Sequence, residues 1–185
     1  MKITKDIDFY INIAIPESKI DKSLFLSQKL NKVERTLSIA EIMTLGNEYD
    51  DKLVIPYYQR DLVWGIKQKT DFIKSIFARN NLGTMIFKRE KIDNHLEWSI
   101  IDGLQRYTTI KEFIECEFRV YDVYFDDLIY DDKYDFITTK ILIEEYSYMS
   151  EKDEINLYIN KNFGGTAHNE TELKELKKYK RLFLK

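Results

Sequence analysis

An apolar run leads directly into a glycine turn in the segment Ser99-Ile100-Ile101-Asp102-Gly103-Leu104-Gln105-Arg106-Tyr107-Thr108-Thr109. Its apolar start predicts a short buried strand at residues 97–101, and a helix is predicted directly after the glycine turn, at residues 105–116. The first N–H groups of a helix lack an intrahelical partner, and the helix dipole adds positive charge there. Gly103 has no Cβ to keep an anion away from them. The junction therefore predicts an anion-binding turn.

Polar side chains around this turn suit a phosphate ligand. Arg106 can bind a phosphate or carboxylate through two parallel hydrogen bonds, and Gln105 and Thr108 are candidates for further contacts. Asp102 either caps the helix or holds Mg²⁺ or a catalytic water. The alternative is an ordinary strand-to-helix turn in which Arg106 pairs with a nearby carboxylate.

A second unusual segment reads Ile55-Pro56-Tyr57-Tyr58-Gln59-Arg60-Asp61-Leu62-Val63-Trp64. We expect Arg60 to add a second guanidinium to the phosphate site and Gln59 to orient a water. Tyr57, Tyr58 and Trp64 are candidates to stack a base against the arginine. A solvated turn after the proline is the alternative. Our hypothesis is that this segment and the glycine turn meet in one site.

A third segment reads Asn160-Lys161-Asn162-Phe163-Gly164-Gly165-Thr166. Asn160 is a candidate nucleotide ligand, although a helix C-terminus followed by a loop would explain the same residues. The helix before it is predicted to start after Ser150 and to end near Ile159.

The remaining patterns predict an α+β domain with a small mixed sheet and surrounding helices. Ser38 and Glu41 form a capping box for a short helix ending at Gly46. Helical spacing also predicts helices at residues 21–33 and 66–77 and a closing helix after Asn169. Strands are predicted at residues 3–13, 53–55, 84–88 and 137–146. A polar hairpin connection is predicted at residues 90–95. Residues 118–125 look extended, and the aspartates of residues 122–135 are typical of a solvated acidic loop. We expect an N-terminal arm and helix at residues 1–37 and the main domain at residues 38–185.

Composition limits the class of protein. The 185 residues are 44% hydrophobic, enough for one compact core. The formal net charge of −3 removes the bulk electrostatic argument for a dedicated nucleic-acid binder. Cys116 is the single cysteine and is expected to be a core residue, and a zinc site is hard to assemble from two histidines and one cysteine. No apolar run approaches the roughly 20 residues that cross a bilayer, so we expect a cytoplasmic protein without membrane contact.

In order and spacing, these three segments resemble the N-terminal domain of GmrSD-type restriction endonucleases, a branch of the ParB/sulfiredoxin-like superfamily. The shared glycine-x-x-arginine turn corresponds to Gly103 and Arg106. The resemblance implies binding and hydrolysis of a nucleoside triphosphate by a domain that often precedes an HNH-type nuclease domain, in systems that attack modified phage DNA. Leu104 stands where the family commonly has glutamine, which implies weakened catalysis and excludes sulfiredoxin chemistry.

Three functions stay open. The first is a nucleoside-triphosphate-binding domain, in which Asp102 and Gln59 would support slow hydrolysis. The second is a phage or mobile-element protein that inhibits a host nuclease by presenting its acidic loop as a DNA mimic. The third is ParB-like DNA binding or nicking. The chain stops at Lys185 without a His-Asn-His cluster, so we expect a nuclease partner in trans and contact with DNA through that partner.

Overall fold

The computed structural model describes residues 31–45, 52–59, 61–93 and 95–163. The chain divides into two compact units, residues 1–31 and 32–185. The predicted boundary, between residues 37 and 38, falls within the first strand of the sheet, Asn31–Ser38, and stays a prediction. The predicted elements at residues 3–13 and after Asn169 lie outside the described residues, as do most of the helix at 21–33, Gly46, Arg60 and residues 164–166.

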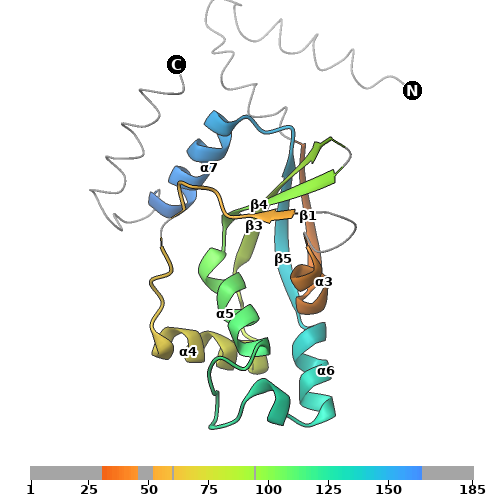
Figure 1. Cartoon of the computed structure of the whole chain (residues 1–185), viewed down its shortest axis with the longest axis vertical. Helices are drawn as coiled ribbons and strands as arrows, with labels where there is room; N and C mark the ends of the chain where they lie inside the picture. Colours follow the sequence, from red (N-terminus) through yellow and green to blue (C-terminus); the bar gives the residue numbers. More distant parts are fainter. Residues whose placement is uncertain (1–30, 46–51, 60, 94, 164–185) are drawn as a thin grey trace, which may run out of the picture. The chain divides into compact units, whose positions relative to one another are not determined.

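The described part is an α+β domain with a mixed sheet, which confirms the predicted fold class (Figure 1). Asn31 to Val33, predicted as the end of a helix, are strand instead. In chain order the elements are β1 (Asn31–Ser38), α3 (Ile39–Thr44), β2 (Lys52–Val54), α4 (Ile66–Phe77), β3 (Thr84–Ile92), β4 (His95–Asp102), α5 (Leu104–Ile114), the 3-10 helix η3 (Phe125–Asp127), α6 (Tyr130–Thr138), β5 (Lys140–Ser147) and α7 (Glu151–Phe163).

The sheet has the strand order β1-β5-β3-β4-β2. Strands β3 and β4 are antiparallel, whereas β3 pairs with β5 and β4 pairs with β2 in parallel. The hairpin is longer than its sequence indicates, since β3 runs to Ile92 and β4 starts at His95. The polar connection predicted at residues 90–95 is therefore mostly strand, because solvent-exposed strand ends carry polar side chains that mimic a loop.

The two faces of the sheet carry separate apolar layers. Met85, Phe87 and Ile143 lie on one face, in the large core that α3, α4, α5 and α6 help to fill. Side chains alternate along a strand, so Ile86 and Lys88 lie on the opposite face. There Lys88 Nζ lies 3.1 Å from Glu154 Oε2 of α7. Helix α7 therefore covers the second face.

The segment at residues 118–135 differs from its prediction. An isolated antiparallel bridge between Val120 and Val123 replaces the expected extended stretch. The acidic loop is largely helical, in η3 and α6. Phe136 of α6 is fully buried, and Asp131 and Asp132 lie in the first turn, where carboxylates interact favourably with the helix dipole.

Helix α4 ends in a Schellman motif. The N–H of Asn80 donates to the carbonyl of Ser75 (3.0 Å) and that of Arg79 to the carbonyl of Ile76 (3.0 Å). Arg79 has a φ of 54°. Glycine is the usual residue at this position, and a side chain there costs roughly 1–2 kcal/mol. The arginine is therefore not explained by the backbone.

The capping box at the start of α3 is confirmed. Ser38 Oγ accepts a hydrogen bond from the N–H of Glu41 (3.2 Å), and the N–H of Ser38 donates to Glu41 Oε2 (2.6 Å). The Ser38 hydroxyl donates to the same Glu41 Oε2 (2.6 Å), and this bond, then the Ser38 N–H and Lys140, lower the pKa of the Glu41 carboxyl to about 2.

Ser38→Ala should lower the free energy of unfolding by about 1 kcal/mol, because one helix N–H loses its acceptor. The folded pKa of Glu41 lies below its unfolded value, so its stabilising effect is present above that value and is lost as the pH falls towards about 2. In Ser38→Ala the free energy of unfolding should accordingly depend less on pH in the acid range. Urea unfolding measures both effects, with Thr44→Ala as the exposed control. Equal losses in the two variants would contradict the capping role.

Candidate functional site

The predicted strand-turn-helix junction is present. Strand β4 ends at Asp102, Gly103 has a φ of 98° and a ψ of 11°, and α5 starts at Leu104. A Cβ on Gly103 would lie 2.8 Å from Met85 Cγ, so both the backbone conformation and the space require glycine. Gly103 has no side chain, so the residue before α5 gives the first N–H groups of the helix no side-chain cap.

The guanidinium of Arg106 is bonded inside the protein. Nη1 donates to the carbonyl of Leu82 (3.0 Å), and Nη2 donates to the carbonyl of Thr84 (2.7 Å) and to Asp102 Oδ2 (3.1 Å). Burial lowers the pKa of Arg106, and the charge of Asp102 opposes that shift. Arg106 thus pairs with a nearby carboxylate, the arrangement set out above as the alternative, and its role as a phosphate ligand stays a prediction.

Two glycines make room for this arginine. Gly83 lies between the two accepting carbonyls and has a φ of 72°; a Cβ there would lie 2.6 Å from Arg106 Nη1. A Cβ on Gly103 would lie 3.3 Å from Arg106 Nη2. The glycine-x-x-arginine turn therefore has a structural function, because it fixes the start of β3 to the start of α5.

The hypothesis that the two segments meet is confirmed by Gln105. Its Oε1 accepts hydrogen bonds from the N–H groups of Val63 (3.0 Å) and Trp64 (3.1 Å), and its Nε2 donates to the carbonyl of Asp61 (3.1 Å). The side chain is buried. Gln105 therefore holds the loop before α4 against the helix start, and its amide is already bonded on both sides.

Gln59 fixes the other end of the same segment. Its Nε2 donates to the carbonyls of Ile100 (2.8 Å) and Ile101 (2.7 Å) at the end of β4. These bonds orient the side chain towards the turn. A water-orienting role for Gln59 stays a prediction, and it would use the carbonyl oxygen of the side chain.

A pocket of about 100 Å³ lies at the junction. Trp64, a predicted base-stacking residue, and Asn162, which was not predicted as a site residue, contribute to its lining. The full lining is Gln59, Trp64, Asp102, Gly103, Leu104, Gln105, Arg106 and Asn162.

Asn162 was missed because α7 extends to Phe163, beyond its predicted end near Ile159. Successive helical residues are about 100° apart, so Asn160 and Asn162 lie on nearly opposite sides of α7. Asn160 is exposed and does not line the pocket. Asn162 Nδ2 donates to the carbonyl of Tyr158 (3.0 Å). Had the helix been predicted to end at Phe163, Asn162 rather than Asn160 would have been the predicted site residue.

Tyr58 is a core residue rather than an open stacking surface. It is 6% exposed, and its ring packs against those of Tyr57 and Tyr158. Its hydroxyl donates to Glu154 Oε1 (2.6 Å), and the other oxygen of that carboxylate, Oε2, accepts from Lys88 Nζ. This Tyr58–Glu154–Lys88 cluster joins the second segment, α7 and β3. No sequence signal marks the buried Glu154.

The remaining predicted site residues are Thr108 and Arg60. Thr108 is half-buried in α5 and does not line the pocket, and Arg60 lies outside the described residues. Within the described ranges, no three His, Cys, Asp or Glu side chains gather in a way that could hold a metal. Mg²⁺ at Asp102 stays a prediction, with one carboxylate oxygen already accepting from Arg106. None of the helices in the described part is long and apolar enough to cross a membrane.

Gly103→Ala should reduce the free energy of unfolding by about 1–3 kcal/mol, because the added Cβ strains the left-handed backbone and overlaps Met85. Gly65→Ala is the matched control, since the nearest atom to its Cβ is 4.0 Å away. It should cost less than about 1 kcal/mol. Chemical unfolding of both variants measures the difference; equal losses would show that the turn is unconstrained.

Tyr58→Phe should cost about 1–3 kcal/mol at neutral pH, because the buried Glu154 carboxylate loses a donor. Burial, then the charge of Glu154, raises the pKa of Tyr58 above its ordinary value of 10.0. The stabilising effect of this hydroxyl is therefore complete below that value and is lost at higher pH. The stability difference from wild type should stay constant up to about pH 10 and shrink as the pH rises above it. The control Tyr57→Phe removes an exposed hydroxyl and should show neither effect.

The comparison with known families agrees with the resemblance of the three segments. The family described as "GmrSD restriction endonuclease, N-terminal domain" matches residues 39–185. A solved structure of a Pnob8-like ParB-N domain is 16% identical with a TM-score of 0.41, and the match covers 80% of this chain and 44% of that one. This chain thus matches less than half the length of that protein. No curated protein matches. The predicted family is confirmed: the chain belongs to the GmrSD restriction endonuclease N-terminal domains.

Proposed function

We propose that this domain binds a nucleoside triphosphate as part of a system that restricts foreign DNA, with the phosphates at the start of α5. The observation that carries the proposal is the uncapped helix start beside Gly103, which opens into the pocket at the junction. Family membership supports the connection with restriction. The N-terminus of a helix attracts anions through its N–H groups and its dipole.

The size of the pocket limits what can enter it. A volume of about 100 Å³ is well below the roughly 300–1,000 Å³ of sites that enclose a whole small molecule. We therefore expect a phosphate group inside and the rest of the nucleotide outside. Trp64 is half-buried at the pocket, and its ring packs on that of Phe72 at 5.5 Å between centroids. It is the aromatic side chain best placed to contact a base.

The bonding of the polar side chains favours binding over hydrolysis. Arg106, Gln105 and the amide nitrogen of Gln59 are all used in bonds that hold the turn together. Rapid phosphoryl transfer needs groups aimed at the transition state, such as a free arginine or a metal held by several ligands. We expect turnover to be slow, with Asp102 and Gln59 as the groups that would support it.

Calorimetric titration with a non-hydrolysable triphosphate and Mg²⁺ tests the proposal on two matched variants. Asn162→Asp places a negative charge in the pocket and should weaken binding by at least about tenfold. Asn160→Asp adds the same charge on the exposed side of α7 and should leave the affinity unchanged. Circular dichroism verifies that both variants fold. Equal effects of the two substitutions, or absence of binding to the wild type, would overturn the proposal.

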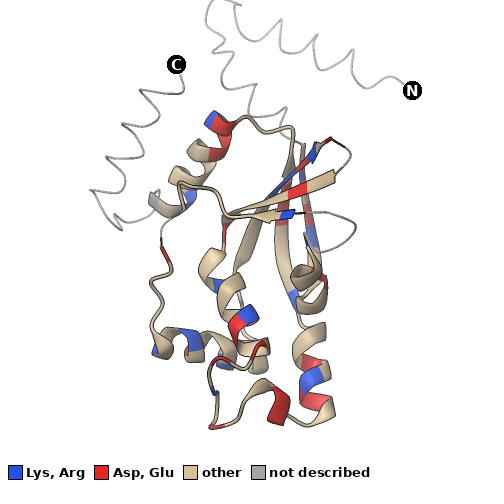
Figure 2. Cartoon of the chain, viewed as in Figure 1, with Lys and Arg blue, Asp and Glu red and all other residues tan. Residues whose placement is uncertain are grey.

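One observation favours a second candidate, an inhibitor of a nuclease. Figure 2 shows acidic residues on η3 and α6, and the rings of Tyr130 and Tyr134 stack beside them, 77% and 53% exposed. Exposed tyrosines among carboxylates fit a basic surface such as a DNA-binding groove. An inhibitor of this kind would need no nucleotide, so failure of the calorimetric titration would favour it.

A further inference from the structure

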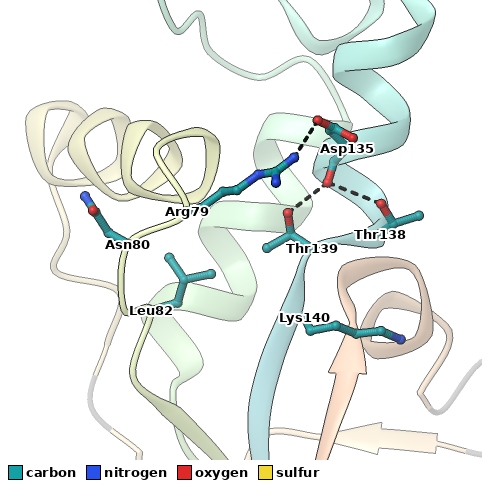
Figure 3. Close-up of a pocket in the computed structure, with 7 residues that line it drawn as sticks. All are labelled: Arg79, Asn80, Leu82, Asp135, Thr138, Thr139 and Lys140. Atoms are coloured by element: carbon teal, nitrogen blue, oxygen red, sulfur yellow. Dashed lines mark hydrogen bonds and ion pairs between the residues drawn. The ribbon is translucent and has the colours of Figure 1, made fainter.

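A second pocket lies between the end of α4 and the junction of α6 with β5 (Figure 3). Its volume of about 350 Å³ falls within the roughly 300–1,000 Å³ typical of small-molecule sites. Arg79 and Asn80 line it from the α4 side, and Asp135, Thr138, Thr139 and Lys140 line it from the other side. None of these residues belongs to the site beside Gly103.

Arg79 is the residue that points to a ligand. It occupies the left-handed position after α4, where glycine would fit without strain. Its Nη2 lies 3.0 Å from Asp135 Oδ2, but both side chains are largely exposed, 78% and 62%. Exposed ion pairs of this kind contribute little to stability. The weak ion pair therefore leaves the Arg79 guanidinium available to a ligand.

The other polar groups define what the ligand must offer. The hydroxyl of Thr138 donates to the carbonyl of Tyr134 (2.7 Å) and that of Thr139 to the carbonyl of Asp135 (2.8 Å), so the hydroxyl oxygens remain acceptors. Lys140 Nζ pairs with Glu41 Oε2 (3.1 Å), and Figure 3 shows its ammonium extending away from Arg79. The pocket thus presents one cationic fork together with several acceptors and the Asn80 amide.

We propose that this pocket binds a small sugar phosphate. The planar guanidinium of Arg79 matches a phosphate group through parallel hydrogen bonds, and the phosphate replaces Asp135 as its partner. Sugar hydroxyls donate to the threonine oxygens and to the released Asp135 carboxylate. Uncharged sugars lack the group that Arg79 recognises, and inorganic phosphate lacks the hydroxyls.

The pocket adjoins the chain segment that holds Arg106. Leu82 lines the pocket, and its carbonyl accepts the hydrogen bond from Arg106 Nη1. Gly83 and Thr84 follow directly. Ligand binding should therefore perturb the amides of these two residues as well as those of the pocket itself.

Nuclear magnetic resonance of the full chain, titrated separately with ribose 5-phosphate, inorganic phosphate and ribose, tests the site. Ribose 5-phosphate should shift the amide signals of residues 79–84 and 138–140; inorganic phosphate should bind more weakly, and ribose should give no shift. Arg79→Gln should weaken binding at least tenfold, whereas Arg119→Gln, which removes another exposed arginine, should not. Arg79→Gly should also lose binding while keeping or raising the melting temperature, because it relieves the left-handed backbone.

Three results would overturn this proposal: no shifts with ribose 5-phosphate, equal affinity in the Arg79→Gln and Arg119→Gln variants, or shifts confined to residues 103–106. The last result would mean that phosphate binds only at the α5 turn. It would support the proposed nucleotide site while excluding this second one, so the two proposals fail independently.

Discussion

The bonds of the Arg106 guanidinium hold the functional end of the domain together. A buried guanidinium is costly unless its N–H groups are paired, and here two carbonyls and one carboxylate pair with it. The accepting carbonyls lie on either side of Gly83, at the start of β3, while the arginine lies on α5. One side chain thus sets the distance between the central strands and the helix start. Loss of Arg106 would leave the Asp102 carboxylate without this partner.

Amide side chains extend this arrangement to the segment before α4. The described residues 55–59 and 61–64 contain no helix or strand, so their backbone groups need other partners. Gln105 supplies partners for three of those backbone groups, and Gln59 donates to the carbonyls at the end of β4. The pocket beside Gly103 is consequently formed before any ligand arrives, which reduces the ordering cost of binding.

Local signals in the sequence were enough to predict much of this architecture. The capping box at Ser38, the helix at residues 66–77 and the strand leading to Asp102 follow from patterns that span a few residues, and the structure agrees. The meeting of two distant segments was predicted from their chemistry rather than from any pattern between them. The partners of Arg106 were harder to foresee, because the carbonyls of Leu82 and Thr84 carry no side-chain signature. The same holds for Tyr58, whose hydroxyl reaches the buried Glu154 from a part of the chain far away in sequence. Such pairs depend on which side chains of α7 and β3 face each other, and only the complete fold determines that.

We propose that the helix start beside Gly103 receives phosphate while Arg106 keeps its internal partners. The decisive measurement is a crystal structure of the chain with a non-hydrolysable triphosphate and Mg²⁺. We expect density for a phosphate group at the N–H groups of Leu104 and Gln105, with Arg106 still bonded to Leu82 and Thr84. A triphosphate bound elsewhere, or a pocket filled by the protein's own side chains, would contradict it.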